Sequence, residues 1–122
     1  MRIYIAGSMR NVPYYNFPEF DKLATALRAE GHTVFNPADI DREAGFDPMT
    51  LPEDHDWSKL PDCLDLREVI KRDIDAILEC DSIWMLPGWE RSTGAIAEYG
   101  VAIWAGLRVV NLDVEHDAGM LS

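Results

Sequence analysis

Glu98 is the side chain in this sequence that is best suited to chemistry. It is the only charged residue among the otherwise apolar residues 95–105. A carboxylate in apolar surroundings is costly unless it is hydrogen-bonded, neutralised or solvated in a cleft. Two interpretations follow: Glu98 is a reactive carboxylate in a ligand cleft, or it leaves the helix at one edge and pairs with Arg10 or Arg91. The residues one helical turn away are small and leave room beside it: Gly94, Ala95, Val101 and Ala102.

Two segments that contain glycine and serine are candidates for binding an anion near Glu98. The first, Gly7-Ser8-Met9-Arg10, follows an expected strand, and the second, Ser92-Thr93-Gly94, opens the helix that carries Glu98. Hydroxyls and free backbone amides at the positive end of a helix suit an oxyanion or a phosphate. Arg10 either closes over that anion or is an ordinary solvated arginine.

Aromatic side chains near the same loops are candidates for stacking a nucleobase. They are Tyr14, Tyr15, Phe17 and Trp89. Ordinary packing is the alternative for all four, and it is the preferred interpretation for Tyr15 and Phe17.

The composition favours a protein that acts on small molecules. The chain has 122 residues, enough for a single domain over residues 1–122, and a formal net charge of −11. No basic surface is available to neutralise phosphates, which argues against polymeric nucleic acid and anionic membranes as partners. No stretch is apolar for long enough to be a transmembrane helix or a signal peptide. The histidines are scattered, so we expect no metal and no organic cofactor, and the two cysteines favour a reduced, cytoplasmic protein.

Hydrophobic periodicity places these residues on alternating strands and helices. Strands are expected at residues 2–6, 32–35, 82–86 and 107–111, and helices at residues 17–28, 64–79 and 93–104. The alternation predicts an α/β fold, a three-layer sandwich around a small parallel sheet of Rossmann or flavodoxin type, with strand order 2-1-3-4. Ligands bind such sheets at the carboxyl ends of the strands where the order reverses, which selects residues 7–11 and 87–94. Residues 38–62, rich in Asp and Pro, are expected to form a long irregular loop.

The apolar faces of two helices carry a further expectation. Five residues of the helix at 64–79 are expected to point inward: Leu66, Ile70, Ile74, Ile77 and Leu78. The helix that follows Ser92 is apolar nearly all round, which is typical of a buried helix. Because this is more apolar surface than a small domain needs, we expect a homodimer or higher homo-oligomer that covers part of it.

Three motifs, in this order along the chain, resemble the nucleoside 2-deoxyribosyltransferase superfamily. They are IYIAGSMR at residues 3–10, RDIDAILECDSIWML at residues 72–86, and the pattern SxGxxxE formed by Ser92, Gly94 and Glu98. Within that superfamily the chain looks closest to the nucleoside 5′-monophosphate N-glycosidases and to short phage and bacterial relatives. The motifs cover most of the chain outside residues 38–62, which have no clear counterpart in that branch.

The resemblance implies three catalytic roles. Glu98 falls on the family's nucleophile, and Asp73 falls on the aspartate that holds the sugar and assists the leaving group. Tyr14 is the candidate for an aromatic of the first loop that takes part in acid–base work or positions the sugar. Such roles suit the reaction, because cleavage at C1′ builds positive charge on the sugar, which a neighbouring carboxylate stabilises or captures as an ester.

The resemblance also implies binding roles. Ser92 and the loop formed by Gly7, Ser8, Met9 and Arg10 fall on contacts to the 5′-phosphate, and Gly94 belongs to the same motif as Ser92. The segment Pro87-Gly88-Trp89 replaces a different lead-in to that serine, and Trp89 is the candidate that shapes the base pocket. Ser122 falls on a serine that reaches the phosphate held by a neighbouring subunit, although here it also bears the terminal carboxylate.

Together these features predict an N-glycosidase that hydrolyses the base–sugar bond of a (deoxy)nucleoside 5′-monophosphate through Glu98. One alternative is a deoxyribosyltransferase, in which a second base rather than water captures the sugar. Another is a non-catalytic module that binds a nucleotide or nucleoside. The identity of the base and the choice between ribose and deoxyribose stay open.

Overall fold

A computed structural model describes residues 1–112 as an α/β fold with one parallel sheet. The strands are β1 (Arg2–Ala6), β2 (Thr33–Phe35), β3 (Ser82–Met85) and β4 (Arg108–Asn111). Their order in the sheet is β2-β1-β3-β4, which confirms the predicted order 2-1-3-4. The order reverses between β1 and β3, because the chain first adds β2 on one side of β1 and then adds β3 and β4 on the other.

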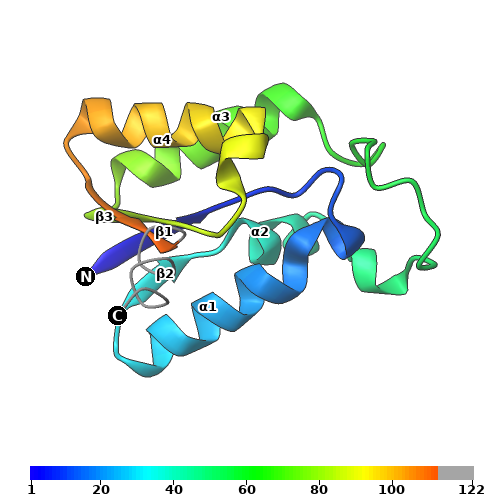
Figure 1. Cartoon of the computed structure of the whole chain (residues 1–122), viewed down its shortest axis with the longest axis horizontal. Helices are drawn as coiled ribbons and strands as arrows, with labels where there is room; N and C mark the ends of the chain where they lie inside the picture. Colours follow the sequence, from blue (N-terminus) through cyan, green and yellow to red (C-terminus); the bar gives the residue numbers. More distant parts are fainter. Residues whose placement is uncertain (113–122) are drawn as a thin grey trace, which may run out of the picture.

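Helices cover both faces of the sheet, which gives three layers (Figure 1). The helices α1 (Phe17–Ala29) and α2 (Pro37–Glu43) lie on one face, and α3 (Leu66–Leu78) and α4 (Thr93–Ala105) lie side by side on the other. Single turns of 3-10 helix occur at Pro13–Asn16, Pro48–Thr50 and Trp89–Arg91. The three helices predicted from periodicity are confirmed to within two residues at each end.

The alternation of side chains along β1 decides which residues reach which layer. Ile3 and Ile5 enter the core under α1, whereas Tyr4 and Ala6 enter the core under α3 and α4. All four are essentially inaccessible to solvent. A polar hydroxyl on Tyr4 is thereby placed in the middle of an apolar layer, beneath the two helices that carry Asp73 and Glu98.

The helix α4 is capped by a side chain at its start and ends at a glycine. Ser92 is the N-cap, because its side chain accepts a hydrogen bond from the backbone N–H of Ala95. Gly106 ends the helix with φ of 84°, a left-handed conformation that glycine adopts at little cost.

The expected loop at residues 38–62 is wrong for its first part. Residues Pro37–Glu43 form α2, with Asn36 as N-cap accepting from the Ala38 N–H at 3.1 Å and with Pro37 in the first turn. The Asn36-Pro37 pair suits the start of a helix, because proline is favoured at the first helical position. Residues 44–65 are irregular apart from one 3-10 turn.

The expected inward face of α3 is also wrong in part. Ile77 is fully buried, but Leu66 and Ile70 are each 46% exposed and Leu78 is 59% exposed. The helix α4 similarly buries Ala95 and Ala102 and leaves outer apolar residues in solvent. A helix lying on one sheet covers only one of its faces, so an all-round apolar sequence does not by itself bury the other. None of the helices within residues 1–112 has the length and apolar character needed to cross a bilayer.

Candidate functional site

Glu98 points from α4 into the core and meets Tyr4 of β1. The Tyr4 hydroxyl donates a hydrogen bond to Oε2 of Glu98, and Tyr4 itself is fully buried. Arg10 and Arg91 are exposed, and neither forms an ion pair with Glu98 in the described part of the chain. The alternative in which Glu98 pairs with Arg10 or Arg91 is therefore wrong. Glu98 as a whole residue keeps some exposed surface, but burial dominates the environment of its carboxyl group.

Asp73 of α3 completes a pair of carboxyl groups with Glu98. Asp73 lies within hydrogen-bonding reach of both Tyr4 and Glu98. Its Oδ1 accepts a hydrogen bond from Nε of Arg72 at 2.8 Å, and Nη1 of Arg72 donates to Oδ1 of Asp41 at 2.9 Å. The sequence prediction thus named both carboxyl groups that the fold brings together from α3 and α4.

Burial dominates the electrostatics of this pair. Loss of solvation raises the pKa of Glu98 to about 8, opposed by the hydrogen bond from Tyr4 and reinforced by the nearby Asp73. Burial also raises the pKa of Asp73, but the bound Arg72 opposes that change. The pKa of Tyr4 is raised by burial and by Glu98, so Tyr4 remains a hydroxyl donor. At neutral pH the pair therefore holds a proton, which Glu98 carries.

Such a pair has the protonation pattern of a two-carboxyl catalyst. One group is available as an acid because its proton is retained, and the other is available as an anion because a cation stabilises it. Movement of the proton from Glu98 to Asp73 exchanges these roles without loss of a proton to solvent. The arrangement can therefore supply a nucleophilic carboxylate and an acid at one place.

The two loops proposed for anion binding lie against each other. The Ser8 hydroxyl donates to the carbonyl of Gly88 at 2.8 Å and is nearly buried. A Cβ atom on Gly7 would lie 2.9 Å from Cβ of Leu86, so only glycine fits where the loops meet. In this structure the Ser8 hydroxyl therefore joins the two loops. Of the remaining loop residues, Met9 packs on the core under α1 and Arg10 is exposed.

Trp89 belongs to the core and is not placed to stack a base. It stacks on Tyr99 with ring centroids 4.9 Å apart, and its Nε1 donates to Oδ1 of Asn111 at 3.3 Å. Ser92 is partly exposed at the start of α4, and Gly94 is exposed, with only the Ser92 hydroxyl, 3.9 Å away, near the place a side chain would take. Ser122 lies outside the described residues.

Tyr14 does not join the carboxyl pair among the described contacts. Its ring lies on that of Trp57, with centroids 5.0 Å apart, and Tyr15 meets the same Trp57 ring edge-on at 5.1 Å. The tyrosine that touches Glu98 is Tyr4, which the sequence analysis missed. The alternation along β1 was the available signal, because it places Tyr4 and Ala6 on one face and the two isoleucines on the other.

A family described as "Domain of unknown function (DUF4406)" matches residues 1–111. The chain belongs to the DUF4406 family. None of the curated proteins compared with this chain matches it. Membership defines the extent of the DUF4406 domain, which includes all four strands and the carboxyl pair, and it leaves the activity to be argued from the site.

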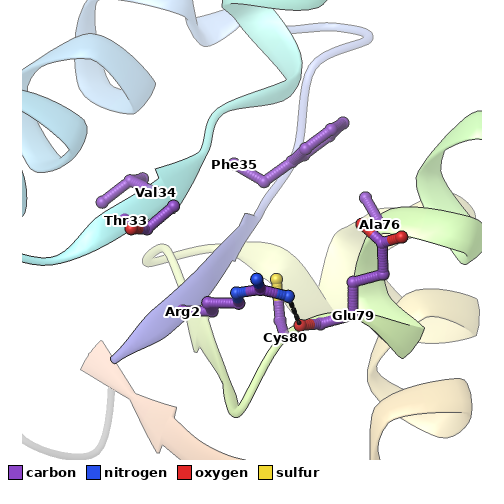
Figure 2. A pocket seen from close by; sticks show the side chains of 7 residues that line it. All are labelled: Arg2, Thr33, Val34, Phe35, Ala76, Glu79 and Cys80. Carbon is purple, nitrogen blue, oxygen red and sulfur yellow. Dashed lines mark hydrogen bonds between the residues drawn. The ribbon is translucent and has the colours of Figure 1, made fainter.

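A hollow of about 300 Å³ lies between β2 and α3 of this DUF4406 domain, and none of Glu98, Asp73 and Tyr4 lines it. One of its walls is Phe35, whose ring stacks on Tyr4 at 5.4 Å. In Figure 2 the Arg2 side chain crosses the opposite end of the hollow toward the backbone carbonyl of Glu79, to which it donates at 3.4 Å. A second hollow, between α1 and the residues after β3, is likewise lined by neither Glu98 nor Asp73. Within residues 1–112 no three acidic, histidine or cysteine side chains gather as a metal site.

Proposed function

We propose that this DUF4406 protein is an N-glycosidase that cleaves the base–sugar bond of a nucleoside 5′-monophosphate, with Glu98 as nucleophile. The observation that carries the proposal is the contact among Glu98, Asp73 and Tyr4, which come from three separate elements. A structural glutamate needs no second carboxyl group beside it, because the like charge makes burial more costly. The motif resemblance to the nucleoside 2-deoxyribosyltransferase superfamily supports the same assignment of Glu98 and Asp73.

The proposed reaction proceeds in two balanced steps. An ionised Glu98 oxygen forms a bond to C1′ while the C1′–N bond breaks and its electron pair stays on the base. The proton that the carboxyl pair shares passes through Asp73 to the departing base. Water then forms a bond to C1′ as the ester oxygen of Glu98 leaves, and a proton of that water returns to the carboxyl pair. The net change is hydrolysis, with the protein regenerated.

The retained proton gives the reaction an expected pH profile. If the singly protonated pair is the active form, kcat/KM falls as the pH rises above the value of about 8 at which Glu98 loses its proton. A rate that instead rises through this pH and stays high would mean that only the anion of Glu98 is needed. Asp73 would then serve to hold the sugar and not to supply a proton.

A substrate panel tests the proposal directly. Purified protein is incubated with ribo- and deoxyribonucleoside 5′-monophosphates and with the matching free nucleosides, and released base is measured by chromatography. We expect base release from monophosphates, and no release by the variant Glu98→Gln, which keeps the shape of the side chain. Base exchange between free nucleosides without hydrolysis would assign the transferase reaction instead. Binding without any turnover would reject catalysis.

We further propose that the protein forms a homodimer through the outer face of α3 and α4. Six large apolar side chains of these adjacent helices are exposed: Leu66, Ile70, Leu78, Ile96, Ile103 and Trp104. Trp104 is 90% exposed, which is unusual for a side chain of that apolar area and marks an interaction surface. Light scattering of the purified chain measures the mass directly, and a monomer at all concentrations would reject this part of the proposal.

A further inference from the structure

We propose that Arg72 is a positioning residue that orients the Asp73 carboxyl group beside Glu98 and couples it to the buried Asp41 of α2. Nothing in the motif resemblance assigns a role to Arg72 or to Asp41. The inference rests on the proposed function only for the statement that the carboxyl pair reacts. The arrangement of charges that it describes stands on the geometry.

One guanidinium serves two carboxylates from two helices. Its Nε donates to Asp73 at 2.8 Å and its Nη1 to Asp41 at 2.9 Å. The side chains of Arg72, Asp73 and Asp41 are only 23%, 13% and 6% exposed. Charge-assisted hydrogen bonds of this length in a partly dry environment hold both partners in a fixed orientation. Arg72 therefore sets the rotation of the Asp73 carboxyl group that Glu98 and Tyr4 face.

Charge balance around the pair also depends on Arg72. The groups that face the pair are Tyr4 from β1, Asp41 from α2 and Arg72 from α3, while α4 contributes Glu98 itself. Arg72 is the cation among them and lowers the pKa of both Asp73 and Glu98. Asp41 acts in the opposite direction and raises the pKa of Asp73. Removing the positive charge of Arg72 should therefore raise the pKa values of the pair, whereas removing the negative charge of Asp41 should lower the pKa of Asp73.

The tie to Asp41 reaches the segment that follows β2. The short helix α2 is held to α1 by Arg42, which bridges Asp21 and Asp39. On its other side, Asp41 is held to α3 by Arg72. A displacement of α2 would thus alter the partners of Arg72 and, through them, the ionisation of the carboxyl pair.

The alternative is that Arg72 only clamps α2 in place. If Arg72 has only that structural role, loss of Arg72 or of Asp41 lowers the stability of the fold and leaves the titration of Glu98 and Asp73 unchanged. A positioning role predicts titration shifts of opposite sign. The decisive variants are therefore Arg72→Gln, which removes the positive charge, and Asp41→Asn, which removes the negative charge and keeps an oxygen acceptor. Lys71→Gln is the matched control, because it removes an exposed positive charge from the same helix.

The measurement is the carboxyl carbon chemical shift of Glu98 and Asp73, followed by NMR across a pH titration of each folded variant. In Arg72→Gln we expect the titration to move to higher pH by about one unit. In Asp41→Asn it moves to lower pH, and in Lys71→Gln it does not move. If Arg72→Gln does not fold, Arg72→Lys retains the charge and is expected to titrate near the wild type. Shifts of the same sign in Arg72→Gln and Asp41→Asn, or no shift in either, overturn the proposal, and so does a displaced titration in a folded Arg72→Lys.

A base-release assay on the same proteins separates this inference from the proposed function. In Arg72→Gln we expect kcat/KM to fall about 10- to 100-fold, because a displaced catalytic group costs rate, and its pH profile to move in the same direction as the NMR titration. Opposite NMR shifts in a protein that cleaves no nucleotide would support the role of Arg72 and reject the glycosidase. Cleavage with an unchanged pH profile in both variants would support the glycosidase and reject the role of Arg72.

Discussion

Replacing Glu98 by glutamine is expected to stabilise the folded protein, by an amount that grows with pH. The glutamine carbonyl accepts the hydrogen bond from Tyr4, and its amide donates to Asp73 as the protonated glutamic acid does. The variant therefore imitates the neutral form at every pH. The wild type has that form in the folded state only while the carboxyl group keeps its proton.

The magnitude follows from the pKa of Glu98, which burial raises from 4.5 to about 8. Below pH 4.5 the group is protonated in the folded and the unfolded chain, so its contribution to stability is constant. Between pH 4.5 and about 8 the unfolded chain releases the proton and the folded chain keeps it. Stability then falls by about 1.4 kcal/mol for each unit of pH. The loss levels off above pH 8 at about 5 kcal/mol, a large part of the roughly 5–15 kcal/mol of an ordinary domain.

Urea unfolding of both proteins at several pH values from about 5 to about 9 measures this difference. We expect the free energies of unfolding to converge at the acidic end and to separate steadily up to about pH 8. Glu90→Gln is the control, because Glu90 is exposed and its variant should differ from the wild type by the same small amount at every pH. A difference between Glu98→Gln and wild type that does not change with pH would refute the reasoning, since Glu98 would then ionise in the folded chain as it does in water.

Three further predictions follow from single contacts. Tyr4→Phe removes the hydrogen-bond donor to Glu98, so the pKa of Glu98 should rise further above its ordinary value. NMR of the Glu98 carboxyl carbon measures this pKa, and an unchanged titration would mean that the hydrogen bond does not affect it. Gly7→Ala should lower the free energy of unfolding by about 1–3 kcal/mol, because its Cβ would lie 2.9 Å from a leucine side chain. The control Gly100→Ala, in open space on α4, should instead stabilise by about 0.5–1 kcal/mol in urea unfolding. Trp104→Glu should convert the proposed homodimer to a monomer in light scattering while the fold, followed by circular dichroism, is kept.

The layers and strand order were predictable because they rest on local patterns. Apolar alternation and helical spacing fix the type of each element, and alternating strands and helices leave few topologies for a parallel sheet. The pairing of Asp73 with Glu98 was also within reach, because both lie on helices of the same face. The short helix α2 was missed, since its seven residues carry too little periodicity to distinguish from a loop.

The partners of the two carboxyl groups were harder to predict. The contact of Arg72 with Asp41 joins residues 31 positions apart, across a segment without regular structure. No periodic pattern encodes such a contact. The partner of Trp89 was equally hard to predict, because Tyr99 lies on the following helix and only the turn between them brings the two rings together. Sequence patterns predict the face on which a side chain lies better than they predict what it touches there.

The apolar character of α4 connects the carboxyl pair with the proposed dimer. Its inner face carries Glu98 against Tyr4, and its outer face exposes Ile103 and Trp104. The neighbouring α3 likewise carries Asp73 on its inner side and exposed Ile70 on its outer side. Association through the outer face would restrain α3 and α4 relative to each other and so fix the separation of the two carboxyl groups. It follows that a folded monomeric variant should have a lower kcat while its affinity for a nucleotide stays largely unchanged. The reason is that the groups that react are carried by the helices that associate.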